Sequence, residues 1–122
     1  MSKKHKKRKS LEQILKEHNS KVAELKKSIK NNYMICKEFV EIYHNKNIMG
    51  EIDLFCYIKL ENDTPLYDLY EVKSGYACDS RIKKHYIELA EYLGLENYRI
   101  FVYDKKGLRV LYIKLQKKKN EE

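Results

Sequence analysis

Residues 50–75, GEIDLFCYIKLENDTPLYDLYEVKSG, contain two apolar segments with alternating polarity on either side of a short polar segment. Residues 51–60 and 66–73 alternate with the period of two that is typical of β-strands. The composition of residues 61–65, ENDTP, is typical of a turn. The stretch therefore predicts a β-hairpin, and in its first strand Ile52 and Leu54 are expected to share one face.

Three charged side chains interrupt this hairpin. Asp53 lies inside an apolar strand, and Glu71 and Lys73, two residues apart, must project from the same face of the next strand. Burying an unpaired charge is costly, so these residues need a reason to be there. A structural ion pair on a solvent-facing sheet surface is one explanation. The other is a site in which two carboxylates hold Mg²⁺ or Mn²⁺ beside an ammonium group, an arrangement suited to phosphodiester hydrolysis.

A helix is expected to precede the hairpin. Ser10 and Gln13 have the spacing of a capping box, and apolar residues then follow with heptad spacing. The residues of this seam are Leu11, Leu15, His18, Val22, Leu25 and Ile29. The seam could pair with a second copy of the chain or pack within the domain, and the sequence leaves both alternatives open. We interpret His18 as a tolerated seam residue.

Residues 33–45, YMICKEFVEIYHN, also show a helical pattern, with Ile35 and Ile42 on one face. At about 100° per residue, Glu38 lies roughly 60° from the centre of that face and Glu41 roughly 120°. Glu38 is therefore the helix carboxylate expected to reach the rest of the domain, with Glu41 as the second choice.

The remainder predicts one helix and two strands. Asp79 or Ser80 can cap a helix over residues 81–93, with Gly94 at its end. The expected strands cover residues 98–104 and 108–115. Together these elements predict an α/β domain with one central mixed sheet. The expected organisation is a basic disordered arm (1–9), an N-terminal helix (10–31), the domain (32–116) and a charged tail (117–122).

The formal net charge of +8 is concentrated at the two ends of the chain. Residues 3–9, KKHKKRK, hold six Lys or Arg and no acid, and residues 114–122 hold four Lys and two Glu. Of 26 basic and 18 acidic residues, 16 of each therefore fall between residues 10 and 113. A basic arm on a neutral domain favours contact with a phosphate backbone, and the alternative is a solubilising tail.

Cysteine spacing and hydropathy argue against a zinc-binding, a membrane-spanning or a secreted protein. Cys36, Cys56 and Cys78 lie 20 and 22 residues apart, without the spacing of a zinc site, so reduced and partly buried thiols are expected. No apolar stretch approaches the roughly 20 residues that span a bilayer, and the N-terminus lacks the apolar segment of a secretory signal. We expect a cytoplasmic protein, with association with the nucleoid as one alternative, and no contact with membranes.

The motifs GEIDLF and YEVKSG resemble the core of the PD-(D/E)xK nuclease superfamily, which includes Holliday-junction resolvases and RecB-like nucleases. The resemblance implies a restriction-endonuclease-like α-β-β-β-α-β core and a Mg²⁺- or Mn²⁺-dependent endo- or exodeoxyribonuclease. It implies that Asp53 and Glu71 bind metal and that Lys73 orients water or stabilises charge. Glu38 would be the helix carboxylate, with Glu41 as second choice.

The resemblance extends to HYIELAEYL, residues 85–93, which is similar to the QxxxY helix of RecB-like nucleases. Glu88 stands where that signature has Gln, and Tyr92 follows four residues later. Residue Ile52 precedes Asp53 where the family name has Pro. The similarity covers residues 33–104 and leaves the first 32 residues outside it.

DNA is favoured over RNA as the substrate, possibly branched or single-stranded DNA, and a homodimer through residues 11–29 would supply a second site. The expected nucleic-acid contacts are Lys3, Lys4, Lys6, Lys7, Arg8, Lys9, Arg81, Lys83, Lys84, Tyr76 and Tyr92. Two other classes are open: a catalytically inactive nucleic-acid-binding module of the same fold, and a basic adaptor that binds protein through its N-terminal helix.

Overall fold

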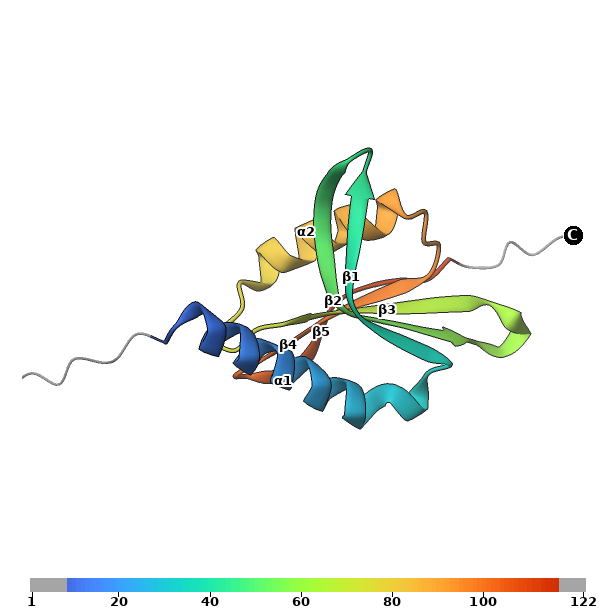
Figure 1. The fold of residues 1–122 in the computed structure, drawn as a ribbon. Coiled ribbons are helices and arrows are strands. Elements are labelled where there is room, and N and C mark those ends of the chain that lie inside the picture. The colour runs from blue at the N-terminus through green and yellow to red at the C-terminus, as the bar shows by residue number, and fades with distance from the viewer. Residues whose placement is uncertain (1–8, 117–122) are drawn as a thin grey trace, which may run out of the picture.

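A computed structural model describes residues 9–116, which form an α/β domain with a five-stranded mixed sheet and two α-helices (Figure 1). The predicted charged tail (117–122), and all of the predicted basic arm except Lys9, lie outside the described residues. The elements, in chain order, are α1 (Leu11–Ile29), β1 (Ile35–His44), β2 (Asn47–Lys59), β3 (Pro65–Val72), α2 (Asp79–Tyr92), β4 (Tyr98–Asp104) and β5 (Gly107–Lys114).

The sheet has the order β1-β2-β3-β4-β5. Neighbouring strands are antiparallel except β3 and β4, which are parallel and joined by α2. A parallel pair needs a crossover connection, and the helix supplies it. The two helices lie on opposite sides of the sheet, and the β1–β2 hairpin bends toward α2 (Figure 1).

Each helix covers its own hydrophobic core. The α2-side core combines Ile82, Tyr86 and Leu89 with buried strand residues such as Ile52 and Leu69. The α1-side core consists of Val22, Leu25, Leu54, Cys56, Tyr70 and Val72. Because both sheet faces are covered, β3 is buried at most positions from Leu66 to Val72, on both of its faces.

The hairpin, both C-terminal strands and the capping box of α1 are confirmed. Residues 61–63 form the turn between β2 and β3, and the Ser10 side chain accepts a hydrogen bond from the backbone N–H of Gln13. Gly94, with φ of 72°, follows α2 as expected. The expected cap of α2 is wrong: Cys78 is the N-cap residue, and its side chain makes no capping hydrogen bond.

The predicted helix over residues 33–45 is wrong, because Ile35–His44 forms the edge strand β1. β-Branched and aromatic residues favour strands, and this segment is rich in them. The helix-like spacing has a local cause. Phe39 has φ of 53°, and the pairing with β2 passes from Glu38↔Leu54 directly to Val40↔Ile52. The register is the same on both sides of Phe39, but the core that the side chains contact changes: Cys36 and Phe39 pack against the α1-side core, and Val40 and Ile42 pack in the α2-side core. The simple period of two is therefore lost across Phe39.

The same irregularity affects β2. Ile52 belongs to the α2-side core, whereas Leu54 belongs to the α1-side core. The expectation that these two residues share a face is therefore wrong. Asp53 lies between them, and the pairing of β2 with β3 begins only at Leu54↔Tyr70. β2 and β3 therefore separate at Asp53, and their separation creates an opening in the sheet.

The seam of α1 is divided between two environments. Val22 and Leu25 pack against the sheet of the same chain. For these two residues, the expectation that the seam packs within the domain is therefore confirmed. Leu11 and Leu15 are 72% and 53% exposed, and Ile14 is 44% exposed. Within residues 9–116, no helix is long and apolar enough to cross a membrane.

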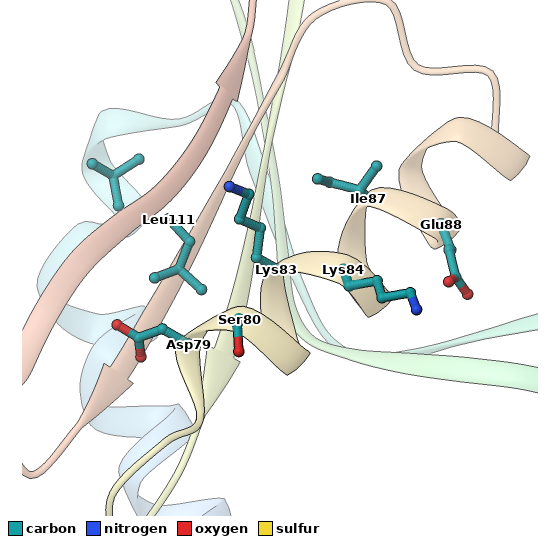
Figure 2. Close-up of a pocket in the computed structure, with 8 residues that line it drawn as sticks. Asp79, Ser80, Lys83, Lys84, Ile87, Glu88 and Leu111 are labelled. Carbon is teal, nitrogen blue, oxygen red and sulfur yellow. The ribbon is translucent and has the colours of Figure 1, made fainter.

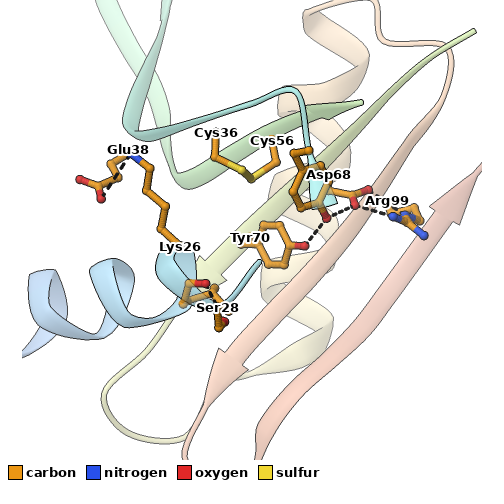
Figure 3. The surroundings of a disulfide bond; sticks show 10 residues. Lys26, Ser28, Cys36, Glu38, Cys56, Asp68, Tyr70 and Arg99 are labelled. Carbon is orange, nitrogen blue, oxygen red and sulfur yellow. Dashed lines mark hydrogen bonds and ion pairs between the residues drawn. A yellow bond between two sulfur atoms is a disulfide. The ribbon is translucent and has the colours of Figure 1, made fainter. Parts of the chain in front are cut away.

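Two cysteines that were expected to be reduced form a disulfide. Cys36 of β1 and Cys56 of β2 are directly opposed, with a Cα–Cα distance of 4.1 Å (Figure 3). This pairing was not predicted because residues 33–45 were expected to form a helix, which would not place Cys36 opposite Cys56. The third cysteine, Cys78, is free and exposed.

Replacing Leu25 tests whether α1 is part of the folded core. We expect Leu25→Ala to lower the free energy of unfolding by about 2–5 kcal/mol, because a cavity forms beneath a nearly buried side chain. The matched variant Leu11→Ala removes an exposed side chain and should change this value by less than about 0.5 kcal/mol. Urea denaturation measures both, and equal effects would show that α1 does not dock through Leu25.

Alkylation of denatured protein tests the disulfide. Without reductant we expect one alkyl group, on Cys78, and after reduction we expect three. In the native protein Cys78 should react readily, since its thiol is exposed and the nearby backbone N–H of Arg81 lowers the pKa of that thiol. Mass spectrometry counts the groups. Three groups without reductant would contradict the disulfide.

Candidate active site

A cavity of about 440 Å³ lies where β2 and β3 separate. Three elements line it: the N-terminal half of α1, the middle of β2 and the C-terminal end of β3 with the residues that follow. The lining residues are Ile14, Leu15, His18, Glu51, Asp53, Glu71, Val72, Lys73 and Ser74. The structure thus brings Asp53, Glu71 and Lys73 together, as the sequence predicted.

The Asp53 carboxylate takes the place of a missing strand contact. Its Oδ2 accepts a hydrogen bond of 2.9 Å from the backbone N–H of Val72, which has lost its partner because β2 has diverged. The side chain is only 7% exposed. A buried backbone donor needs an acceptor, so the opening of the sheet and the position of Asp53 depend on each other.

Glu71 is held from both sides. Its Oε1 accepts a hydrogen bond of 2.6 Å from the Tyr86 hydroxyl, and its Oε2 lies 3.3 Å from the Lys73 ammonium. The contact with Tyr86 is partly buried, whereas Lys73 is exposed and lines the cavity. Oε1 of Glu71 is therefore fixed by Tyr86, and Oε2 forms the ion pair with Lys73.

Tyr86 of α2 reaches through the α2-side core into the opening. Its hydroxyl lies 3.3 Å from the carbonyl oxygens of Glu51 and Tyr70 and accepts from the Asp53 N–H at 3.4 Å. These backbone groups lie at and next to the point where the pairing of β2 with β3 ends. Burial raises the pKa of Tyr86 well above its usual value, so the hydroxyl stays protonated and donates to Glu71.

His18 of α1 approaches from the opposite side. Its Nε2 lies 3.2 Å from Asp53 Oδ2 and 3.0 Å from the carbonyl oxygen of Val72. A carbonyl oxygen only accepts hydrogen bonds, so Nε2 carries the hydrogen in this arrangement. His18 therefore orients Asp53 and links α1 to the sheet at the site. The interpretation of His18 as a merely tolerated seam residue is wrong.

The two carboxylates favour a positive charge between them. Burial, followed by repulsion from Glu71, raises the pKa of Asp53 to about 7. Two close carboxylates cannot both ionise freely, so near neutral pH the pair holds a proton or a cation. The exposed Glu51 adds a third acid to the same cavity.

The donor set fits a hard divalent cation. Within residues 9–116, no group of three or more His, Cys, Asp or Glu side chains is arranged to hold a metal ion. However, Mg²⁺ is commonly held by one or two carboxylates and keeps several of its waters. Asp53 and Glu71 supply two carboxylates, and their mutual repulsion gives a cation a favourable place.

Glu38 and Glu41 are not at this site. Glu38 lies on β1 opposite Leu54, with an oxygen 3.8 Å from the Lys26 ammonium, and Glu41 pairs with Glu51 across the strands. Neither lines the cavity. Their assignment depended on the wrong helix over 33–45. The helix side chains that contact the two carboxylates are His18 of α1, at Asp53, and Tyr86 of α2, at Glu71.

The expected contacts on α2 lie elsewhere. Lys83, Lys84 and Glu88 line a second, larger cavity of about 610 Å³ between α2 and β5 (Figure 2), which shares no lining residue with the first. The Tyr92 hydroxyl donates to the carbonyl oxygen of Tyr43. Arg81 is exposed at the start of the helix. The structure thus does not bring Glu88 and Tyr92 to the carboxylates.

The expected contacts on the basic arm fall mainly outside the described residues. This applies to Lys3, Lys4, Lys6, Lys7 and Arg8. Lys9 is described, and its ammonium lies 2.8 Å from Glu17 of α1. Tyr76 is exposed and lies three residues beyond Lys73.

Sequence reasoning missed two residues that hold the site together. His18 could have been identified by its polarity, since it is the one polar residue in an otherwise apolar seam. Tyr86 gave no such signal, because it lies on the apolar stripe of α2 and reads as core. Only the separation of β2 and β3 reveals what its hydroxyl contacts.

Comparisons of the chain with protein-family models, with curated proteins and with solved structures found no match.

The pKa of Asp53 predicts an unusual pH dependence of stability in metal-free protein. Between about pH 4 and 7 the folded state binds more protons than the unfolded state, so the free energy of unfolding should fall as pH rises. Asp53→Asn should remove this component. Glu71→Gln should reduce it only in part, because burial remains the larger cause.

Urea denaturation across this pH range, with EDTA present, measures the slope. An identical slope in wild type and Asp53→Asn would contradict the raised pKa.

Proposed function

We propose that this protein is a metal-dependent nuclease that hydrolyses phosphodiester bonds in DNA. The observation that carries the proposal is the pairing of Asp53 and Glu71 in a solvent-reached opening, with the Lys73 ammonium 3.3 Å from Glu71. Two carboxylates without a cation would repel a phosphate. With a divalent cation, the same cavity would attract one.

Each residue has a distinct part in this proposal. Asp53 and Glu71 would hold Mg²⁺ or Mn²⁺, which supplies charge neutralisation and an acidified water when bound. Lys73 would orient that water or stabilise negative charge on the phosphate. Tyr86 and His18 are positioning residues, because they fix Glu71 and Asp53 by hydrogen bonds and reach no reacting atom.

The fold supports this assignment. The order α1-β1-β2-β3-α2-β4 corresponds to the α-β-β-β-α-β core of the PD-(D/E)xK superfamily that the motifs resemble, and β5 is added to it. We therefore propose a restriction-endonuclease-like fold. In this correspondence α1, rather than a segment after residue 32, is the first helix of the core.

The partner proposals follow from charge and from exposed surface. The excess of basic residues at the two ends favours nucleic acid. DNA is favoured over RNA because it is the commonest substrate of the superfamily that the motifs resemble. We also propose a homodimer through residues 11–29. Val22 and Leu25 are buried within the chain, so the dimer interface on α1 would consist of exposed residues such as Leu11 and Leu15.

Cleavage assays with variants test the proposed activity. The substrates are single-stranded, duplex, flap and four-way-junction DNA, and RNA, each with Mg²⁺, Mn²⁺ or EDTA. We expect metal-dependent cleavage that falls at least ~10³-fold in Asp53→Ala, Glu71→Ala and Lys73→Ala, since each removes charge from the reacting centre. Glu38→Ala is the matched control and should retain activity.

Three results would count against this proposal. Undiminished cleavage in the three site variants would remove the site assignment. DNA binding without cleavage under any metal condition would favour the inactive binding module. A wild-type protein that neither binds nor cleaves nucleic acid would favour the adaptor.

A further inference from the structure

One aromatic side chain beside the site is exposed and surrounded by cations. Tyr76 is 70% exposed. The ammonium groups of Lys105 and Lys106 lie 5.8 Å and 5.9 Å from the centre of its ring. Both lysines come from the turn between β4 and β5 and are themselves exposed. We refer to Tyr76, Lys105 and Lys106 as the tyrosine platform.

The platform is held in place by a buried carboxylate. Asp104, only 2% exposed, accepts hydrogen bonds of 2.8 Å from the backbone N–H groups of both Ala77 and Lys106. It therefore joins the segment that carries Tyr76 to the turn that carries the lysines. Arg109 donates to Asp104 and lowers the pKa of that carboxyl, so the anchor stays charged.

The platform also lies next to the carboxylate site. The Lys73 N–H donates to the carbonyl oxygen of Tyr103, and the Lys105 N–H donates to that of Gly75. Three residues of chain span at most about 11 Å, which limits the separation of the Tyr76 and Lys73 backbones. A nucleic-acid strand with its scissile phosphate at Lys73 would therefore have a neighbouring nucleotide at Tyr76.

The chemistry of the platform suits an unpaired nucleotide. An exposed aromatic ring offers a stacking face to a base, and adjacent ammonium groups offer contacts to phosphate. In a duplex, base faces are covered by their neighbours, so Tyr76 could not stack on them. On α1, at the cavity wall, the half-exposed Ile14 and Leu15 add apolar surface without charge.

We infer that the tyrosine platform binds a base and adjoining phosphate of single-stranded DNA, next to the bond to be cut. This inference rests on the proposed function, because it assigns the strand that enters the carboxylate site. It further restricts the substrate to DNA that is unpaired beside the scissile phosphate. The ring of Tyr76 carries the preference for unpaired DNA, and the lysines carry salt-dependent affinity.

Binding of a labelled thymidine oligonucleotide, measured by fluorescence anisotropy with Mg²⁺ present, tests the inference without cleavage. All variants are made in the Lys73→Ala protein, because this protein is expected not to cleave and its carboxylates keep their cation. Tyr76→Ala should weaken binding roughly 5- to 150-fold, the range found for loss of one base–aromatic stack. Tyr76→Phe should retain affinity because it retains the ring. Tyr43→Ala removes another half-exposed tyrosine, on β1, and should leave binding unchanged.

The lysines have a separate readout. The double variant Lys105→Ala and Lys106→Ala should reduce the slope of log affinity against log salt by about 1.4, as two lost phosphate contacts on a single strand would. Lys46→Ala, in the β1–β2 turn, is the matched control and should leave the slope unchanged.

The outcomes separate the platform from the nuclease. Unchanged oligonucleotide binding in Tyr76→Ala, an equal loss on duplex DNA, or a larger loss on RNA of matching sequence would overturn the platform. If Asp53→Ala alone abolishes cleavage and Tyr76→Ala has no effect on binding, the platform falls and the nuclease stands. If Tyr76→Ala weakens binding but the wild type cleaves nothing, the platform stands and the nuclease falls.

Discussion

The repulsion between the carboxylates of the buried Asp53 and the partly buried Glu71 is the constraint on which the site depends. Each group occupies a place that the separation of β2 from β3 creates. Asp53 satisfies the unpaired N–H of Val72, and Glu71 accepts from Tyr86, so neither can move away without exposing a buried polar group. A proton or a cation relieves the repulsion, which adds to burial in raising the pKa of Asp53 to about 7.

The rest of the fold keeps that opening in place. α1 contributes His18 from one face of the sheet, and α2 contributes Tyr86 from the other. The residues that bury the two helices, such as Leu25 and Leu89, therefore also position the hydrogen bonds that hold the carboxylates. At the end of β4, the buried Asp104 accepts hydrogen bonds from the backbone N–H groups of Ala77 and Lys106. These hydrogen bonds hold the segment that carries Tyr76 beside the turn that carries the lysines.

Much of this arrangement could be predicted from the sequence. The hairpin around residues 61–63 and the approach of Asp53 to Glu71 and Lys73 followed from strand alternation and turn composition. Predictions from the alternation of apolar and polar residues were wrong where the backbone departs from regular strand geometry. The irregularity at Phe39 made β1 look like a helix, and this moved the helix carboxylate to Glu38 and concealed the Cys36–Cys56 disulfide. The roles of His18 and Tyr86 required the spatial approach of distant segments, which no local pattern records.

The central claim is that Asp53 and Glu71 share a cation. Anomalous diffraction from crystals grown with Mn²⁺ tests it most directly, because it locates the ion without depending on a substrate or on activity. We predict an anomalous peak within coordination distance of both carboxylates, and its loss in the Asp53→Asn protein. A fully ordered site with no peak between Asp53 and Glu71, or a peak that persists there in Asp53→Asn, would contradict it.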